Sequence, residues 1–208
     1  MKAITLYQPW ASLMAVGAKI NETRPKSTQF RGDICIHAAL KEPDPPELVM
    51  EAALEVFAKQ PREWFQVKSD LGCIVAVVEI WEVRPSECFL RKDDVPLGLP
   101  HIEISETERI FGDYSPGRWV YRTRNLRPLK KPVPCRGYQC IGWKVPPDVE
   151  ALVRAQLPVQ CSFGVCSGHP CMRTATWAAM FDGKRSGLYW CDEHRVDSNL
   201  SKHGVEKL

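Results

Sequence analysis

Hydrophobic and polar positions alternate along much of the chain with a period that predicts a β-rich domain. Strand-like segments place apolar residues at every second position or contain runs of β-branched residues. The longest such run spans residues 71–83 and includes Ile74, Val75, Val77, Val78 and Ile80. Strands are expected at residues 3–7, 19–24, 33–38, 71–83, 118–123 and 139–145.

Proline and glycine residues interrupt this pattern and mark where two helices begin or end. Pro9 suits the first turn of a helix, where a missing N–H costs nothing, and Gly17 is a natural C-terminal stop. Pro45 and Pro46 open a second helix that runs to about residue 59, with apolar residues spaced for one buried side.

The remaining segments limit how the sheet is built. Residues 124–138 contain three prolines, so they cannot form a central strand. Residues 85–117 mix proline, glycine and charge, and we expect loops with short helical turns there. Strands of this number with helices between some of them fit an α+β fold, a small mixed β-barrel with flanking helices.

The 208 residues are enough for one domain and a small additional module. We expect the barrel domain at residues 1–146, a linker helix at 147–160 that begins at a Pro-Pro pair, and a separate module with a polar tail at 161–208.

Composition and cysteine usage bound the class of protein. A hydrophobic fraction of 44% supports a core, and 25% charged residues is ordinary for a soluble protein. No apolar run approaches the roughly 18 residues that cross a membrane, and the N-terminus lacks the apolar centre of a signal peptide. We therefore expect a soluble cytoplasmic protein without a membrane partner. Nine cysteines with a local cluster favour metal binding over a disulfide framework.

The C-terminal cysteine cluster has the spacing of a zinc site: Cys-x4-Cys, a hairpin-sized gap, and then Cys-x2-His. Four such ligands can surround one zinc ion in a closed, structural site. A module of roughly 45 residues has too small a core to fold unaided, and a metal would supply that stability. Either Cys161 or His169 could replace Cys166 as a ligand. The alternative to a metal site is a set of free thiols that are packed together by chance. The expected ligands are Cys166, Cys171, Cys191 and His194.

Basic residues dominate the segment from Arg109 to Lys144, where Asp113 is the one acidic residue. Such a stripe suits a phosphate backbone, whereas a solvated basic face of the barrel is the alternative interpretation. The members expected to contact nucleic acid are Arg118, Arg122 and Arg124.

Charged residues are also dense near the N-terminus, where Lys19, Glu22 and Arg24 share one expected strand. Cores rarely need so many charges beside buried positions, so this spacing indicates a site. Three pieces of sequence in this region, in this order, resemble the ASCH domain of the PUA-like superfamily, and the resemblance extends over about residues 1–146. The pieces are Gln-Pro-Trp-Ala-x-Leu at 8–13, Gly-x-Lys-x-x-Glu-x-Arg at 17–24 and Arg-Gly-x-x-x-Ile-His-Ala-Ala at 31–39.

The resemblance implies a PUA-like barrel with a cleft that holds a nucleotide of single-stranded RNA or DNA, or a modified nucleoside. It brings the Lys19 segment beside Glu79, which lies near the end of the long strand. For Trp10 and His37 a place in the core is the structural alternative. The residues expected to contact a nucleotide, besides the basic stripe, are Trp10, Lys19, Arg24, Arg31 and His37.

A hydrolase is the alternative within the same family. A small bacterial ASCH enzyme deacetylates N4-acetylcytidine with a lysine, a threonine three positions later and a glutamate on a central strand. Lys19 and Glu79 match the first and last, but Glu22 replaces the threonine, and Thr23 would point to the opposite face of a strand. Burial can lower the pKa of a lysine, which lets it act as a base or a nucleophile at neutral pH, whereas a neighbouring glutamate keeps it protonated. Two carboxylates around one lysine could still activate a water.

The leading hypothesis is therefore binding of nucleic acid or a modified nucleoside, with phosphates on the basic stripe. The alternative is an amidohydrolase acting on N4-acylated cytidine or a related nucleoside, with Lys19, Glu22 and Glu79 as catalytic residues. A ribonuclease and a protein adaptor that uses the zinc module are weaker alternatives. An ion-pair network that only closes the barrel is the structural alternative for all of these charges.

Overall fold

The computed structural model describes residues 1–41, 44–60 and 71–158, together with the backbone of residues 177–181, 184–190 and 205–207. The chain divides into two units, Met1–Gln156 and Leu157–Leu208, and each is described by itself.

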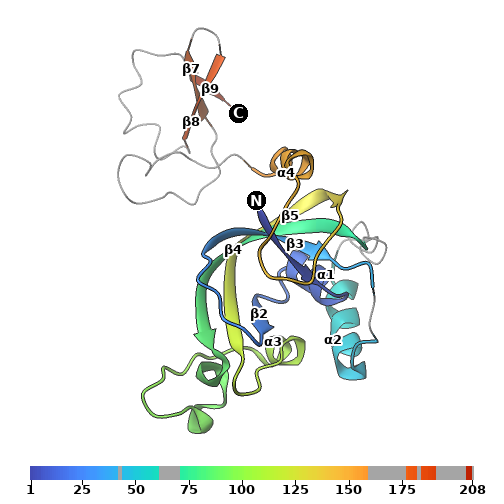
Figure 1. The fold of residues 1–208 in the computed structure, drawn as a ribbon, viewed down its shortest axis with the longest axis vertical. Coiled ribbons are helices and arrows are strands. Elements are labelled where there is room, and N and C mark those ends of the chain that lie inside the picture. Colours follow the sequence, from blue (N-terminus) through green and yellow to red (C-terminus); the bar gives the residue numbers. More distant parts are fainter. Residues whose placement is uncertain (42–43, 61–70, 159–176, 182–183, 191–204, 208) are drawn as a thin grey trace. The chain divides into compact units, whose positions relative to one another are not determined.

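The first unit is built on one six-stranded sheet in the order β2-β5-β4-β3-β1-β6. The pair β1–β3 is parallel, and the other neighbours are antiparallel. The sheet curls into a half-barrel, so its two ends approach each other (Figure 1). The strands are β1 (Lys2–Leu6), β2 (Asn21–Arg24), β3 (Gly32–Ala38), β4 (Cys73–Pro85), β5 (Trp119–Pro134) and β6 (Trp143–Lys144).

Among the residues that the structure describes, four α-helices accompany this sheet, and the short helix α1 packs against both the strands and the other helices. Ala11, Met14 and Ala15 of α1 belong to the core cluster formed by the strands. Leu13 of the same helix packs instead with residues of α2 and α3, including Phe111. The helices are α1 (Trp10–Ala15), α2 (Glu47–Ala58), α3 (Glu106–Phe111) and α4 (Pro147–Arg154).

The proline-rich segment forms more strand than expected, but not in the centre of the sheet. β5 pairs with β2 only over Trp119–Arg122, and it continues to Pro134 beside β4 alone. A proline lacks the N–H that a second neighbour would need, so the extension is confined to an edge. Two short 3-10 turns, Ser86–Phe89 and Lys92–Asp94, and α3 fill the expected loop region.

The second unit contains a three-stranded antiparallel sheet in the order β8-β7-β9. Its strands are β7 (Trp177–Phe181), β8 (Lys184–Trp190) and β9 (Val205–Lys207), and Trp177 pairs in register with Trp190. The candidate zinc ligands Cys166, Cys171, Cys191 and His194, like Cys161 and His169, lie outside the described residues. Within the described part of the chain, no helix is long and apolar enough to cross a membrane.

Gly17 ends α1 as expected and adopts a positive φ of 78°. A Cβ atom there would also lie 3.2 Å from Cδ2 of Leu126. We expect Gly17→Ala to lower the free energy of unfolding by about 1–2 kcal/mol, because a side chain in this backbone region is strained. Urea unfolding measures the loss. Gly98→Ala is the control for backbone strain without a close contact, since Gly98 has a φ of 89° but nothing within 4 Å of its Cβ position. The loss at Gly17 should be at least as large as the loss at Gly98, because the contact with Leu126 adds to the strain. A smaller loss at Gly17 than at Gly98 would contradict this account.

Candidate ligand-binding pocket

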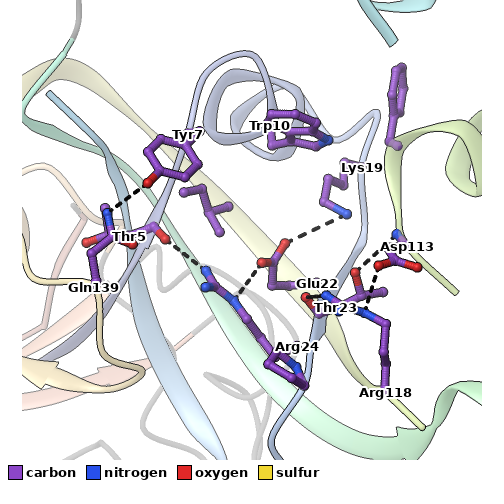
Figure 2. A pocket seen from close by; sticks show the side chains of 13 residues that line it. Thr5, Tyr7, Trp10, Lys19, Glu22, Thr23, Arg24, Asp113, Arg118 and Gln139 are labelled. Atoms are coloured by element: carbon purple, nitrogen blue, oxygen red, sulfur yellow. Dashed lines mark hydrogen bonds and ion pairs between the residues drawn. The ribbon is translucent and has the colours of Figure 1, made fainter. Parts of the chain in front are cut away.

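A polar pocket of about 240 Å³ opens where the two ends of the curled sheet approach each other. Its walls come from the end of β1, from β2, from α1 and from the segment after α3 (Figure 2). The residues that line it are Thr5, Leu6, Tyr7, Trp10, Lys19, Glu22, Thr23, Arg24, Pro25, Phe111, Asp113, Arg118 and Gln139.

Lys19 is the most deeply placed charge in this pocket, with only 2% of its surface exposed. Its Nζ atom lies 3.8 Å from Oε2 of Glu22 and 4.0 Å from Oε1 of Glu108. Neither distance is a hydrogen bond, and the ammonium has no hydrogen-bond partner among the described residues. A buried ammonium in this state has unused donors, which a ligand in the pocket can satisfy.

Arg24 connects the two strands that flank the pocket. Its Nε atom lies 2.9 Å from Oε1 of Glu22, and its Nη2 atom donates a hydrogen bond of 2.8 Å to the Thr5 carbonyl oxygen (Figure 2). Because Thr5 belongs to β1 and Arg24 to β2, this side chain bridges the gap that the sheet leaves open. The Glu22 carboxylate is thereby placed between two cations.

The rim of the pocket is held by polar contacts. The Tyr7 hydroxyl accepts a hydrogen bond of 3.4 Å from Gln139, and Asp113 lies 3.2 Å from Arg118 in an ion pair. Hydrogen bonds from Ser115 hold the pKa of Asp113 below its usual range. The Trp10 ring stands at the same opening (Figure 2). The rim thus offers an aromatic surface beside charged and neutral hydrogen-bonding groups.

Glu108 lies behind the pocket and is a residue that the sequence pattern did not single out. Its carboxylate accepts hydrogen bonds from the backbone N–H of Ile20 and Asn21 and from the Tyr114 hydroxyl. Burial raises the pKa of this carboxyl group, and the Lys19 charge opposes that shift. The sequence signal around it, Ser105-x-x-Glu108, is typical of a helix cap. Such a signal marks the start of α3 and does not indicate a residue of the pocket.

The expectation that Glu79 faces Lys19 across the pocket was wrong. Glu79 does not line this pocket, and its carboxylate accepts hydrogen bonds from Arg124 at 2.7 and 2.9 Å and from Asn125. The hydrogen bonds from Arg124 lower the pKa of Glu79. Glu79 and the buried Ile80 are consecutive strand residues and point to opposite faces of the sheet, which directs Glu79 outward.

His37 and Arg31 also lie outside the lining of the pocket. His37 is buried, its Nε2 atom is 2.9 Å from the Cys135 carbonyl oxygen, and its ring meets that of Trp143 edge-on. Burial lowers its pKa. Arg31 is exposed and bonds to the carbonyl groups of Thr28 and Phe30. Of the two interpretations of His37, its position corresponds to a core residue, although its Nδ1 atom has no hydrogen-bond partner among the described residues.

The basic stripe is less cationic than its sequence indicates. Carboxylates from neighbouring strands pair with the arginines of β5: Arg122 lies 2.7 Å from Glu82, and Arg124 lies 2.7 Å from Glu79. Only Arg118 of the three predicted contacts lines the pocket. The segment has Asp113 as its one acid in the sequence, but strand pairing brings further acids to it.

The ion pair between Glu79 and Arg124 predicts an acid-dependent stability. A glutamate whose pKa is lowered on folding contributes stability above its unfolded pKa, and this contribution is lost as the pH falls through the folded pKa. Urea unfolding of the wild type from about pH 6 to about pH 3 should show this loss, and Arg124→Gln should show a weaker one. Lys130→Gln, at an exposed position of the same strand, is the control. Equal acid dependence in the wild type and Arg124→Gln would contradict a structural role for the pair.

Comparison with known proteins places this geometry in a family. The model of the ASCH domain matches residues 4–122, a stretch that includes most of β1, all of β2 and Glu108. No curated protein matches the chain. The crystal structure of ASCH from Zymomonas mobilis is similar at 10% identity and a TM-score of 0.42, over 74% of this chain and 94% of that one.

Two point mutants of the same Zymomonas mobilis protein are similar as well. A serine-to-alanine mutant has 12% identity and a TM-score of 0.41 over 74% of this chain and 94% of that one. A tyrosine-to-phenylalanine mutant has 11% identity and a TM-score of 0.40 over 73% and 95%. Because the domain model covers more than half of the 208 residues, the chain belongs to the ASCH domain family.

Proposed function

We propose that the pocket between β1 and β2 binds one nucleobase, either of a single-stranded RNA or of a free modified nucleoside. The observation that supports this most directly is the buried Lys19 ammonium, which lines the pocket without a hydrogen-bond partner among the described residues. A carbonyl oxygen of a base is an acceptor that this donor can use. ASCH domains are linked to RNA binding in general, which agrees with such a ligand.

The size and lining of the pocket support a small, flat, polar ligand. Its volume of about 240 Å³ is below the roughly 300–1,000 Å³ of pockets for drug-sized molecules. Proteins that read unpaired bases combine stacking on an aromatic side chain with hydrogen bonds to the base edges. Trp10 offers the ring, Lys19 and Arg24 offer donors, and Glu22 offers an acceptor.

Contacts to phosphate groups are proposed to be few. All three expected arginines are paired with carboxylates, Arg118 with Asp113, Arg122 with Glu82 and Arg124 with Glu79, and of these only Arg118 lines the pocket. Each neutralised phosphate of a single strand contributes about −0.7 to the slope of log affinity against log salt. A shallow salt dependence is therefore expected, and most of the affinity would come from the base.

Hydrolysis of an N4-acylated cytidine is the second candidate, and the proximity of Lys19 to Glu22 favours it. In this reaction a water attacks the amide carbonyl carbon, a carboxylate accepts the proton of the water, and the exocyclic amine leaves with a proton. The sequence analysis expected Glu22 and Glu79 around Lys19. In the structure the two carboxylates near Lys19 are Glu22 and Glu108, so Glu108 takes the place of Glu79. In this proposal one of these carboxylates is the base, and Lys19 acts as an electrostatic donor to the amide oxygen.

Binding is tested by calorimetry with cytidine, N4-acetylcytidine and a short unstructured RNA. Lys19→Met should weaken binding about 10–100-fold, because hydrogen bonds from a charged group contribute about 1.5–3 kcal/mol. Glu22→Gln provides a second variant at the same wall should Lys19→Met fold poorly, and it should weaken binding as well. Glu79→Gln is the matched control, since Glu79 lies outside the pocket.

The outcomes separate the two candidates. Binding that is lost in Lys19→Met and kept in Glu79→Gln supports recognition in this pocket, and release of cytidine from N4-acetylcytidine by the wild type supports hydrolysis. Failure of the wild type to bind any of the three probes overturns the proposed function. Equal weakening by Lys19→Met and Glu79→Gln would also overturn the assignment of the pocket.

We further propose that the C-terminal unit binds one structural zinc ion. The support is the chemistry and spacing of the donors, since thiolate and imidazole ligands in a Cys3His set suit tetrahedral zinc. The proposed ligands are Cys166, Cys171, Cys191 and His194, with Cys161 and His169 as alternatives.

Elemental analysis of the purified full-length protein should find about one zinc per chain. Cys191→Ser should remove the metal, because three remaining ligands leave the site open. Cys88→Ser is the control, because Cys88 is a buried cysteine of the first unit that the proposed set does not use. A zinc content that is unchanged in Cys191→Ser would contradict the proposed ligands.

A further inference from the structure

The Glu108 carboxylate is buried, with 2% of the residue exposed, and it contacts the segment that carries Lys19. We propose that Glu108 is the positioning residue of the pocket: it fixes the backbone next to Lys19 and places a countercharge beside the lysine ammonium. This inference rests on the proposed function, because it assigns the residue that prepares Lys19 for a ligand.

The backbone around Lys19 is held from both sides. On the N-terminal side, the N–H groups of Ala18 and Lys19 both donate to the Leu13 carbonyl oxygen, at 2.9 and 3.1 Å. On the C-terminal side, the N–H groups of Ile20 and Asn21 donate to the two oxygens of Glu108, at 2.8 and 3.2 Å. A side chain of α3 therefore holds the two N–H groups that follow Lys19, while Thr123 of β5 donates to the Ile20 carbonyl oxygen.

The Glu108 carboxylate is itself held in place. The Tyr114 hydroxyl donates to it at 3.0 Å, and the Asn21 side chain donates to the Tyr114 oxygen at 3.1 Å. The Ser105 hydroxyl accepts a hydrogen bond from the Glu108 N–H, which fixes the start of α3. Side chains that support a site in this way keep its functional group within a fraction of an ångström.

Glu108 also completes the charge balance around the lysine. Lys19 Nζ lies 3.8 Å from Glu22 on β2 and 4.0 Å from Glu108 on α3. The other charged or titratable groups that line the pocket are Tyr7, Arg24, Asp113 and Arg118. Glu22 is shared with Arg24 at 2.9 Å, which leaves Glu108 as the carboxylate without an arginine partner among the described residues. Opposite charges at this distance offset part of the cost of burying the ammonium.

A purely structural residue and a countercharge differ in their effect on pH dependence. Wild-type binding of N4-acetylcytidine should weaken as the pH falls through the raised pKa of Glu108, because protonation of this carboxylate removes the countercharge, and Glu108→Gln should lack this weakening. Tyr114→Phe is the matched control: it removes a neutral hydrogen bond from the same cluster and leaves the charge of Glu108 in place. It should keep the weakening at low pH that the wild type shows.

The result that would overturn the inference is a loss of binding at low pH in Glu108→Gln that matches the loss in the wild type, even if the affinity falls uniformly. A measurement without ligand keeps the test independent of the proposed function and of the folding of the variant. In the wild type, the Lys19 side-chain NMR signal should shift as the pH falls through a value above the ordinary glutamate range, since the pKa of Glu108 is raised by burial. A Lys19 signal that shifts only within the ordinary range would refute the coupling, whereas absence of nucleoside binding alone would refute only the proposed function.

Discussion

The burial of one ammonium group is the constraint on which the site depends. Removing a lysine charge from water is costly unless opposite charges or hydrogen bonds compensate it. Here Lys19 has two carboxylates near 4 Å and no hydrogen-bond partner among the described residues. The electrostatic part of the compensation is present, while the donors of the ammonium remain available at the wall of the pocket.

The curled sheet creates the place where such a group can be useful. The six strands form a half-barrel, so β1 and β2 approach each other without pairing in the sheet order. Arg24 crosses this gap with a hydrogen bond to the Thr5 carbonyl, and the pocket lies beside that bridge. The opening is therefore a consequence of incomplete closure, and its polar lining follows from backbone and side-chain groups that face a gap instead of a neighbouring strand.

Charge on the outer face of the sheet serves a different purpose. The arginines of β5 stand opposite acids of β3 and β4, in the pairs Arg122–Glu82, Arg124–Glu79 and Arg127–Asp33. Cross-strand pairs of this kind contribute modestly to stability and help fix the register. The register of β4 and β5 shifts at several places along the pair, so side-chain pairs that fix the register are useful there. These three arginines of the basic stripe are thus paired with carboxylates, which lowers the cationic character expected of this chain's stripe.

Local sequence by itself determined most of the elements and part of the site. Strand alternation, Gly17 as a helix stop and proline as a bar to central strands are local effects, so these features were predictable, and so was the grouping of Lys19, Glu22 and Arg24 on one short segment. Only the tertiary structure decided which carboxylates meet Lys19. Glu79 and Glu108 are both far from Lys19 in the sequence, and the choice between them depends on which face of β4 is buried and on where α3 packs. Neither follows from spacing along the chain, because long-range contacts are set by the curl of the sheet and the shared core.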